Sequence, residues 1–263
     1  MKIDRGISCL VTGASSGIGR AVALQLGRRG ARVALLARTE AALEKVAVEV
    51  RQAGGDALVV AADVQDADAV VAAVERTVGS FGNLRLLVAN AGLGRYALVE
   101  DQPAEHVATT ISINYVGMTH VVRAALPHLL TAAPSHVVGV TSSAALIPHR
   151  LASAYCASKA ASNAYLAALR LEVLDRGVGV SWVCPGVVDT PFIAKSELDP
   201  EADLPRLARL LVRTLTPNEV AAATLEAVEH NRAEVVLPWT MRMFAMSRRI
   251  APRFADWLHR VTG

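Results

Sequence analysis

Short apolar runs alternate with segments of helical periodicity along nearly the whole chain, and this order limits the possible folds more than any other feature. Seven runs are typical of buried strands, and helix-like segments separate them. The predicted strands are Cys9–Thr12, Arg32–Ala37, Ala57–Ala61, Leu84–Ala89, His136–Ser142, Val178–Val183 and Glu234–Leu237. The predicted helices cover Arg20–Arg29 with a start near Ser16 or Gly17, then about Thr39–Ala53, Asp66–Val78, Pro103–Leu130, Ser153–Asp175 and a segment from about Pro217. The alternation predicts a single α/β domain over residues 1–263, with a doubly wound (Rossmann-like) seven-stranded parallel sheet and helices on both faces.

Composition and charge exclude several classes of protein. Hydrophobic residues make up 52% of the chain and charged residues 19%, which suits helices packed on a buried parallel sheet. The net charge of +3 is too small to indicate nucleic-acid binding. Cys9, Cys156 and Cys184 are expected to be buried free thiols, and neither a signal peptide nor a membrane-spanning apolar run is visible. We therefore expect a cytoplasmic protein without a metal site or a nucleic-acid partner.

A glycine-rich turn joins the first predicted strand to the first helix. Gly13, Gly17 and Gly19 allow a sharp turn and a close approach of the backbone to a ligand. The N-terminus of the following helix would direct unpaired N–H groups and its positive end toward that ligand, which favours phosphate. Taken alone, the cluster is equally compatible with an ordinary connecting turn. A phosphate-binding NTPase is disfavoured because the turn lacks the Gly-Lys-Ser/Thr ending.

Polar residues follow several of the predicted strands directly. Any one of them is explained by a turn or a helix cap. Because ligands of doubly wound sheets bind beyond the carboxyl ends of the strands, the joint placement predicts that these residues meet along one edge. They are Thr12, Asp63, Asn90, Ser142 and the pair Pro185–Gly186.

Tyr155 and Lys159 stand four residues apart in a predicted helix, so their side chains face the same way. A tyrosine that works as a general acid or base near neutral pH needs its pKa lowered by roughly three units, or about 4 kcal/mol. A cation about 4 Å away supplies approximately that amount at an effective dielectric near 20. We expect Lys159 to lower the Tyr155 pKa in this way and the Ser142 hydroxyl to hydrogen-bond a substrate carbonyl.

Taken together, these motifs resemble the short-chain dehydrogenase/reductase family in its compact single-domain branch, over nearly the whole chain. The turn Thr12–Gly19, Asp63–Val64 and Asn90–Gly92 match the family's cofactor turn, adenine contact and central-sheet segment. The resemblance implies catalytic roles for Asn114, Ser142, Tyr155 and Lys159. The expected cofactor contacts are Gly13, Ser15, Ser16, Gly17, Ile18, Gly19, Asp63, Val64, Asn90, Ala91, Gly92, Tyr155, Lys159, Pro185, Gly186, Val188 and Thr190.

The reaction implied by the resemblance is reversible hydride transfer between a nicotinamide ring and a carbonyl carbon. In this reading Tyr155 gives the proton to the carbonyl oxygen, Ser142 orients that oxygen, and Lys159 also binds the nicotinamide ribose. Asn114 holds a water in a proton relay that leads from Lys159. The alternative from another class is a cofactor-binding regulator or scaffold that kept the fold and lost catalysis.

NADP is the favoured cofactor and NAD the less favoured one. NAD sites of this kind place a carboxylate at the end of the second strand, where it accepts the ribose 2′-hydroxyl. The corresponding region here is Leu36–Thr39, which holds no carboxylate and contains Arg38. The planar guanidinium of Arg38 can pair with a 2′-phosphate.

Three further segments concern the substrate and the partners. Residues 189–213 contain apolar side chains and are expected to fold over an apolar carbonyl or alcohol substrate, with Ala144–Leu151 lining the other side. Residues 240–263 are basic and amphipathic, which predicts packing on the fold or a partner subunit, or contact with an anionic membrane. Family likeness also implies a homodimer or homotetramer, through the two long helices that precede and carry Tyr155.

Overall fold

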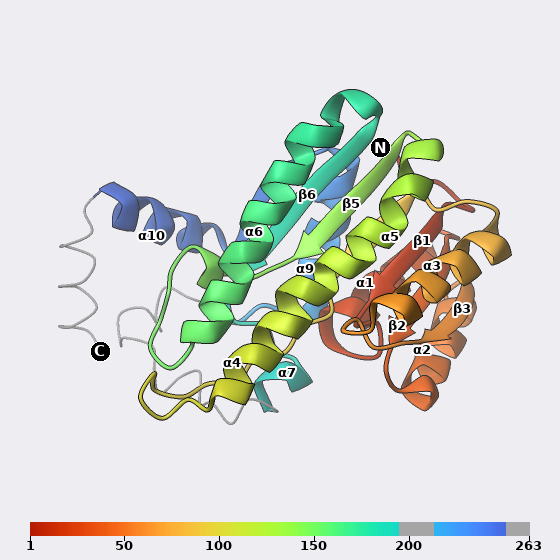
Figure 1. The fold of residues 1–263 in the computed structure, drawn as a ribbon. Helices are drawn as coiled ribbons and strands as arrows, with labels where there is room; N and C mark the ends of the chain where they lie inside the picture. The colour runs from red at the N-terminus through yellow and green to blue at the C-terminus, as the bar shows by residue number, and fades with distance from the viewer. Residues whose placement is uncertain (195–212, 251–263) are drawn as a thin grey trace.

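The protein is built on one parallel sheet with the strand order β3-β2-β1-β4-β5-β6-β7 (Figure 1). This computed structural model describes residues 1–194 and 213–250. The strands are β1 (Ser8–Thr12), β2 (Arg32–Ala37), β3 (Asp56–Ala61), β4 (Leu86–Ala89), β5 (Ser135–Val140), β6 (Val178–Pro185) and β7 (Glu234–Leu237). The order reverses between β1 and β4, as in doubly wound sheets. The predicted fold class is confirmed.

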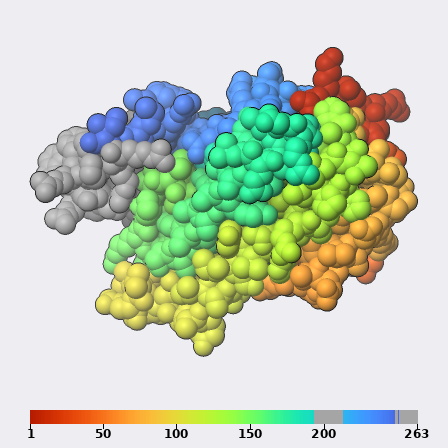
Figure 2. Space-filling model, turned by 45° about the horizontal axis from the view of Figure 1, so that its top comes forward, coloured from red at the N-terminus to blue at the C-terminus, as the bar shows by residue number. Residues whose placement is uncertain are grey.

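Helices cover both faces of the sheet (Figure 1). Helices α1, α2 and α9 contribute to the hydrophobic core on one face, and α3, α5 and α6 to the core on the other. The helices are α1 (Gly17–Arg28), α2 (Glu40–Gln52), α3 (Ala67–Phe81), α4 (Ala104–Ile111), α5 (Gly117–Thr131), α6 (Ser153–Val173), α7 (Pro191–Ala194), α9 (Pro217–Glu229) and α10 (Trp239–Ile250). Figure 2 shows α5 and α6 on the surface, with α10 toward one end of the molecule.

The apolar strands face a core on each side, which explains why they show little polar alternation. In β1, Cys9 and Val11 belong to one core and Leu10 to the other. Every residue of β4 and β5 is buried. A fully buried leucine such as Leu10 contributes about 2 kcal/mol to folding. The sheet is therefore fixed from both faces, and only its edges and strand ends remain for ligands.

The long helix expected over Pro103–Leu130 is interrupted. A π-helical turn, Ser112–Val116, separates α4 from α5. Its middle residue is Asn114, whose side chain is buried and hydrogen-bonded to the loop after β4. Single π turns of this kind are frequent at functional sites. The periodicity of apolar residues did not predict the break, because the extra residue per turn is set by a contact from another part of the chain.

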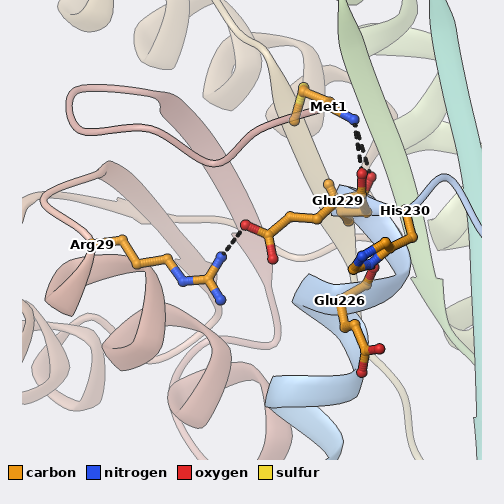
Figure 3. A network of polar contacts seen from close by, with 6 residues as sticks. Met1, Arg29, Glu226, Glu229 and His230 are labelled. Atoms are coloured by element: carbon orange, nitrogen blue, oxygen red, sulfur yellow. Dashed lines mark hydrogen bonds and ion pairs between the residues drawn. The ribbon is translucent and has the colours of Figure 1, made fainter.

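The C-terminal end of α9 makes polar contacts with Met1 and with Arg29, the residue that follows α1 (Figure 3). The amino nitrogen of Met1 donates to the carbonyl oxygens of Val228 at 3.4 Å and Glu229 at 3.3 Å. The Arg29 guanidinium forms an ion pair with the Glu229 carboxylate at 2.8 Å. Positive groups at a helix C-terminus offset its negative end. These contacts join the C-terminal end of α9 to the N-terminus of the chain and to the C-terminal end of α1.

Two predicted segments are described only in part. Of the segment 189–213, residues 195–212 lie outside the described residues, including Leu198, Leu204 and Leu207. Of the tail 240–263, residues 251–263 lie outside the described residues, and the described part belongs to α10. No helix within residues 1–194 and 213–250 is long and apolar enough to cross a membrane.

Candidate active site and dinucleotide site

The glycine turn connects β1 to α1 as expected. Gly13 has φ +64° and Gly17 has φ +54°, a backbone conformation that residues with a Cβ rarely adopt. No side chain caps the N-terminus of α1 at Ser16, and its first turn carries no acidic residue. The backbone N–H groups of this end are therefore available to an anion. Ser15 and Ile18, both half-buried, complete the turn.

The amide group of Asn90 holds this turn closed. The Asn90 backbone N–H donates to Thr12 Oγ1 at 2.9 Å, and Asn90 Nδ2 donates to the Thr12 carbonyl at 3.0 Å. The N–H of Ala91 donates to the same hydroxyl at 3.0 Å. A Cβ added at Gly19 would collide with the Gly13 carbonyl and would stand 2.6 Å from Asn90 Nδ2. Glycine is therefore required here by packing against the loop after β4.

Other predicted contacts lie around the same turn. The N–H of Ala14 donates to the Leu36 carbonyl at 3.2 Å, which places the end of β2 and the exposed Arg38 next to the turn. A Cβ at Gly17 would lie 3.2 Å from Thr190 Cγ2, so the segment after β6 reaches the turn from the opposite side. The structure thus brings segments that are distant in sequence to one edge of the sheet.

The remaining predicted contacts follow β3 and β6. Asp63 Oδ1 accepts from the N–H of Gln65 at 3.0 Å, and the buried Val64 side chain packs toward Gly117. The N–H of Gly186, directly after Pro185, donates to the Leu237 carbonyl at 2.6 Å. Val188 is buried and forms a parallel bridge with Leu215.

Ser142, Tyr155 and Lys159 meet at the ends of β5 and α6. The Tyr155 side chain is buried and the Ser142 hydroxyl hydrogen-bonds its phenol. Lys159 Nζ lies 5.8 Å from the Tyr155 ring centroid and donates to the Val140 carbonyl at 3.3 Å. A Cβ at Gly92 would lie 3.3 Å from the same Nζ, so the ammonium group faces the loop after β4. These three side chains form one compact polar group.

Burial controls the ionisation of this group. It raises the pKa of Tyr155 to about 12, and the hydrogen bond from Ser142 offsets only part of that rise. Burial also lowers the pKa of Lys159 to about 8. The expectation that Lys159 depresses the Tyr155 pKa is therefore not met among the protein's own side chains. The reason is that burial disfavours the charged phenolate, and among the groups that shift this pKa only the Ser142 hydroxyl lowers it.

The Asn114 amide bridges the loop after β4 and the catalytic helix. Its Oδ1 accepts from the N–H of Leu93 at 2.7 Å, and its Nδ2 donates to the Leu93 carbonyl at 2.9 Å and to Ser158 Oγ at 2.9 Å. Ser158 Oγ in turn donates to the Tyr155 carbonyl at 2.7 Å. Sequence reasoning missed Ser158, whose only signal is a small polar residue three positions after the tyrosine. The water relay through Asn114 stays a prediction.

Aromatic side chains surround the tyrosine, and one of them, Tyr96, was missed. Tyr96, in the loop after β4, and Phe192, in α7, each place their ring centroids 5.8 Å from that of Tyr155. His149 stacks on Tyr96 at 6.4 Å. Phe192 was expected near the substrate, whereas Tyr96 was not singled out. Its signal was an aromatic residue shortly after the Asn90–Gly92 motif.

The arrangement defines a class of protein: a doubly wound sheet with a glycine turn at an uncapped helix N-terminus and a buried Ser-Tyr-Lys group. Comparison with known proteins agrees. The family model for short chain dehydrogenases matches residues 8–201. The chain belongs to the short-chain dehydrogenase/reductase family of NAD(P)-dependent oxidoreductases, as its motifs predicted.

Individual relatives support this membership. The chain is similar to "Probable oxidoreductase EphD" of Mycobacterium tuberculosis, with 34% identity over 249 residues. That match covers 90% of this chain but 42% of the relative, so the chain spans less than half of its length. It also resembles a Burkholderia phymatum short chain dehydrogenase/reductase solved with NAD, with TM-score 0.86, 28% identity, and coverage of 97% of this chain and 96% of the other. A Burkholderia cenocepacia short chain dehydrogenase solved with NADP gives TM-score 0.80, 30% identity, and coverage of 89% and 97%.

Proposed function

We propose that the protein interconverts a carbonyl group and a secondary alcohol on an apolar small molecule, using NADP. The observation that carries this proposal is the buried group of Ser142, Tyr155 and Lys159 beside the glycine turn. A phenol, a hydroxyl and an ammonium within one apolar site suit proton transfer to a carbonyl oxygen. Family membership supports the reaction class.

The residues of the turn fit a dinucleotide. The uncapped N-terminus of α1 suits the pyrophosphate, and added Cβ atoms at Gly13 and Gly19 would collide with their neighbours. Lys159, with its ammonium next to Gly92, suits the ribose hydroxyls. When bound, the dinucleotide supplies or accepts the hydride.

The protein's own side chains handle the proton. Because the pKa of Tyr155 is raised to about 12, the phenol holds its proton at neutral pH and suits donation to a carbonyl oxygen. The Ser142 hydroxyl keeps that oxygen in line with the phenol. Lys159, with a pKa of about 8, stays charged at neutral pH and stabilises the negative charge left on Tyr155.

The preference for NADP rests on Arg38. Its exposed side chain stands at the end of β2, next to the turn through the Ala14–Leu36 hydrogen bond. A guanidinium there suits a 2′-phosphate, whereas NAD offers only a hydroxyl. Titrating both reduced dinucleotides by fluorescence tests this point, and tighter binding of NADH would reverse the choice.

A panel of ketones and secondary alcohols tests the reaction itself. Purified protein is mixed with each compound and with NADPH or NADP, and absorbance at the reduced-nicotinamide band is followed. We expect turnover of apolar ketones. Dinucleotide binding without turnover of any compound would contradict the enzyme and support the alternative of a catalytically silent regulator or scaffold.

We propose homodimer or homotetramer formation through α4, α5 and α6. Helices α4 and α6 pack together, and large apolar side chains are exposed on both: Val107 on α4 at 38%, Leu171 near the end of α6 at 82%, and Leu174 directly after α6 at 47%. Large exposed apolar side chains on adjacent helices are typical of protein contacts. Light scattering on wild type and on Leu171→Glu tests this arrangement, and a wild type that stays monomeric at micromolar concentration would contradict it.

A peripheral membrane contact through α10 is proposed as well. Trp239, Met243, Met246 and Ile250 are exposed at 69%, 59%, 54% and 80%, and their spacing places them on one face of the helix. Residues 239–250 contain three arginines and no acidic residue, which suits anionic lipid. Co-sedimentation with phosphatidylserine vesicles, with and without residues 240–263, tests it. Absence of binding by the intact protein would end the proposal.

The cytoplasm remains the proposed compartment. All three cysteines are free and buried, which suits reducing conditions. Fractionation of cells with an antibody against the native protein checks this placement.

A further inference from the structure

Two aromatic rings from distant segments flank the phenol of Tyr155. Tyr96 belongs to the loop after β4, and Phe192 belongs to α7 after β6. Their centroids each lie 5.8 Å from the Tyr155 centroid, with interplanar angles of 47° for Tyr96 and 51° for Phe192. Both rings are thus tilted against the ring whose hydroxyl transfers the proton.

Both rings also come close to Gly94. A Cβ built at Gly94 would stand 2.7 Å from Tyr96 Cε2 and 2.9 Å from Phe192 Cζ. Any larger residue would push at least one ring away. Gly94 therefore lets the edges of both rings converge on one point beside the catalytic tyrosine.

Apart from Ser142 at the Tyr155 hydroxyl and His149 on Tyr96, the residues packed around these rings are apolar. Ala144, Ala152 and Cys156 are buried with Tyr155 in one cluster, and Tyr96 and Phe192 pack against it. Burial raises the pKa of the Tyr96 phenol, so this ring stays neutral. A group that enters here meets aromatic faces and edges together with small apolar side chains. Aromatic rings prefer tilted or offset contact with other aromatic rings, beyond what buried area alone supplies.

The position of the rings determines which part of a substrate they contact. The carbonyl oxygen must lie at the Tyr155 hydroxyl to receive its proton. Because Tyr96 and Phe192 stand beside that same phenol, they contact the group bonded directly to the carbonyl carbon. More remote parts of a substrate lie beyond their reach.

We infer that Tyr96 and Phe192 are specificity-determining residues that select substrates whose carbonyl or carbinol carbon carries a flat aromatic ring, over saturated rings of the same size. This inference rests on the proposed function and names its substrate class. Each ring contact is expected to favour the aromatic compound several-fold.

Equilibrium binding tests the inference without relying on turnover. Calorimetric titration of the NADP-loaded protein compares acetophenone with cyclohexyl methyl ketone, which have the same carbon skeleton. We expect acetophenone to bind about tenfold more tightly. Tyr96→Leu and Phe192→Leu are each expected to reduce that ratio to below about threefold, whereas Tyr96→Phe retains it because the ring remains.

A matched control removes an aromatic pair elsewhere. Tyr165 forms an edge contact with Tyr115 at 6.2 Å, away from the Tyr155 cluster. Tyr165→Leu is expected to leave the binding ratio unchanged. Thermal melts of all variants with NADP establish that each one folds.

The outcomes separate this inference from the proposed function. A wild-type ratio near one, no measurable binding of either ketone, or an unchanged ratio in both leucine variants would overturn the inference. If acetophenone binds preferentially but no ketone is turned over, the proposed function fails and the aromatic selection stands. If ketones are turned over but acetophenone is not bound preferentially, the proposed function stands and the aromatic selection fails.

Discussion

The dinucleotide half and the substrate half of the site are built from different materials. In the glycine turn proposed to hold the dinucleotide, Gly13 and Gly19 leave no room for a Cβ, and the Asn90 side-chain amide donates to the main-chain carbonyls of Thr12 and Gly13. In the half proposed to take the substrate, side chains provide the surface, and the rings of Tyr96 and Phe192 lie beside the Tyr155 ring. The comparison teaches that a turn packed against backbone atoms leaves no room for an added side-chain atom. A pocket lined by side chains, by contrast, can change its shape by substitution.

Tyr155, where the two halves meet, is expected to show the largest effect. Tyr155→Phe removes only the hydroxyl that we propose donates the proton. We expect turnover to fall about 10²- to 10⁴-fold while NADPH binds within about twofold of wild type. Steady-state kinetics and fluorescence titration measure both quantities. Near wild-type turnover would remove Tyr155 from the mechanism.

The buried charge of Lys159 is expected to lower the free energy of unfolding of the wild-type protein. Its pKa is about 8 in the folded protein against an ordinary 10.5, which corresponds to a penalty of roughly 3 kcal/mol for burying the charge. Lys159→Met is therefore expected to raise the free energy of unfolding at pH 7 by up to about that amount while turnover is lost. Urea denaturation measures the stability.

The pH dependence sharpens the Lys159 prediction. Between pH 8 and 10.5 the unfolded chain binds more protons at this site than the folded one, so wild-type stability should rise with pH. Below pH 8 the penalty is present in full. The advantage of Lys159→Met should therefore shrink as pH rises through this window. A stability difference that is constant from pH 7 to 10 would contradict the assigned cause.

Gly19→Ala attacks the backbone half. The added Cβ meets the Gly13 carbonyl and Asn90 Nδ2, which cannot both move away, so we expect a loss of about 2 kcal/mol in unfolding free energy and weaker NADP binding. Gly79→Ala is the matched control, since a Cβ there meets nothing within 4 Å, and α3 should gain up to about 1 kcal/mol. Equal effects of the two substitutions would refute the packing argument.

Arg38→Ala tests the side-chain contact proposed for the dinucleotide half. Of the substitutions considered, we expect it to have the smallest effect. Losing one charge-assisted pair should weaken NADPH binding about tenfold and leave NADH within about twofold. Arg76→Ala, an exposed arginine on α3, serves as the control. Parallel losses for both dinucleotides would mean that Arg38 does not read the 2′-phosphate.

Much of the fold was predictable because the sheet is buried on both sides. The bounds of β2 and β7 agree with the sequence residue for residue, since continuous apolar runs bounded by turn residues mark such strands. The π turn at Ser112–Val116 was not predictable. It depends on Asn114 bonding to Leu93, a contact that helical periodicity does not encode.

The candidate site divides in the same way. Motif spacing predicted that Ser142, Tyr155 and Lys159 meet, and they do. It did not predict the direction of the Tyr155 pKa shift, because spacing gives the distance to a charge and not the loss of water around the phenol. Tyr96 was missed because its role depends on a neighbour, Phe192, about a hundred residues further along the chain.

The sequence by itself determined the doubly wound fold class, the glycine turn and the residue types at the strand ends. These follow from local periodicity and from the backbone freedom of glycine. Only the tertiary structure decided which side chains are buried away from water and where a π turn follows α4. It also decided that two aromatic rings come close to Gly94 beside Tyr155. Desolvation and ring packing arise from contacts between segments that are far apart in the chain, and the physical reason for the limit is that such contacts leave no periodic trace in the sequence.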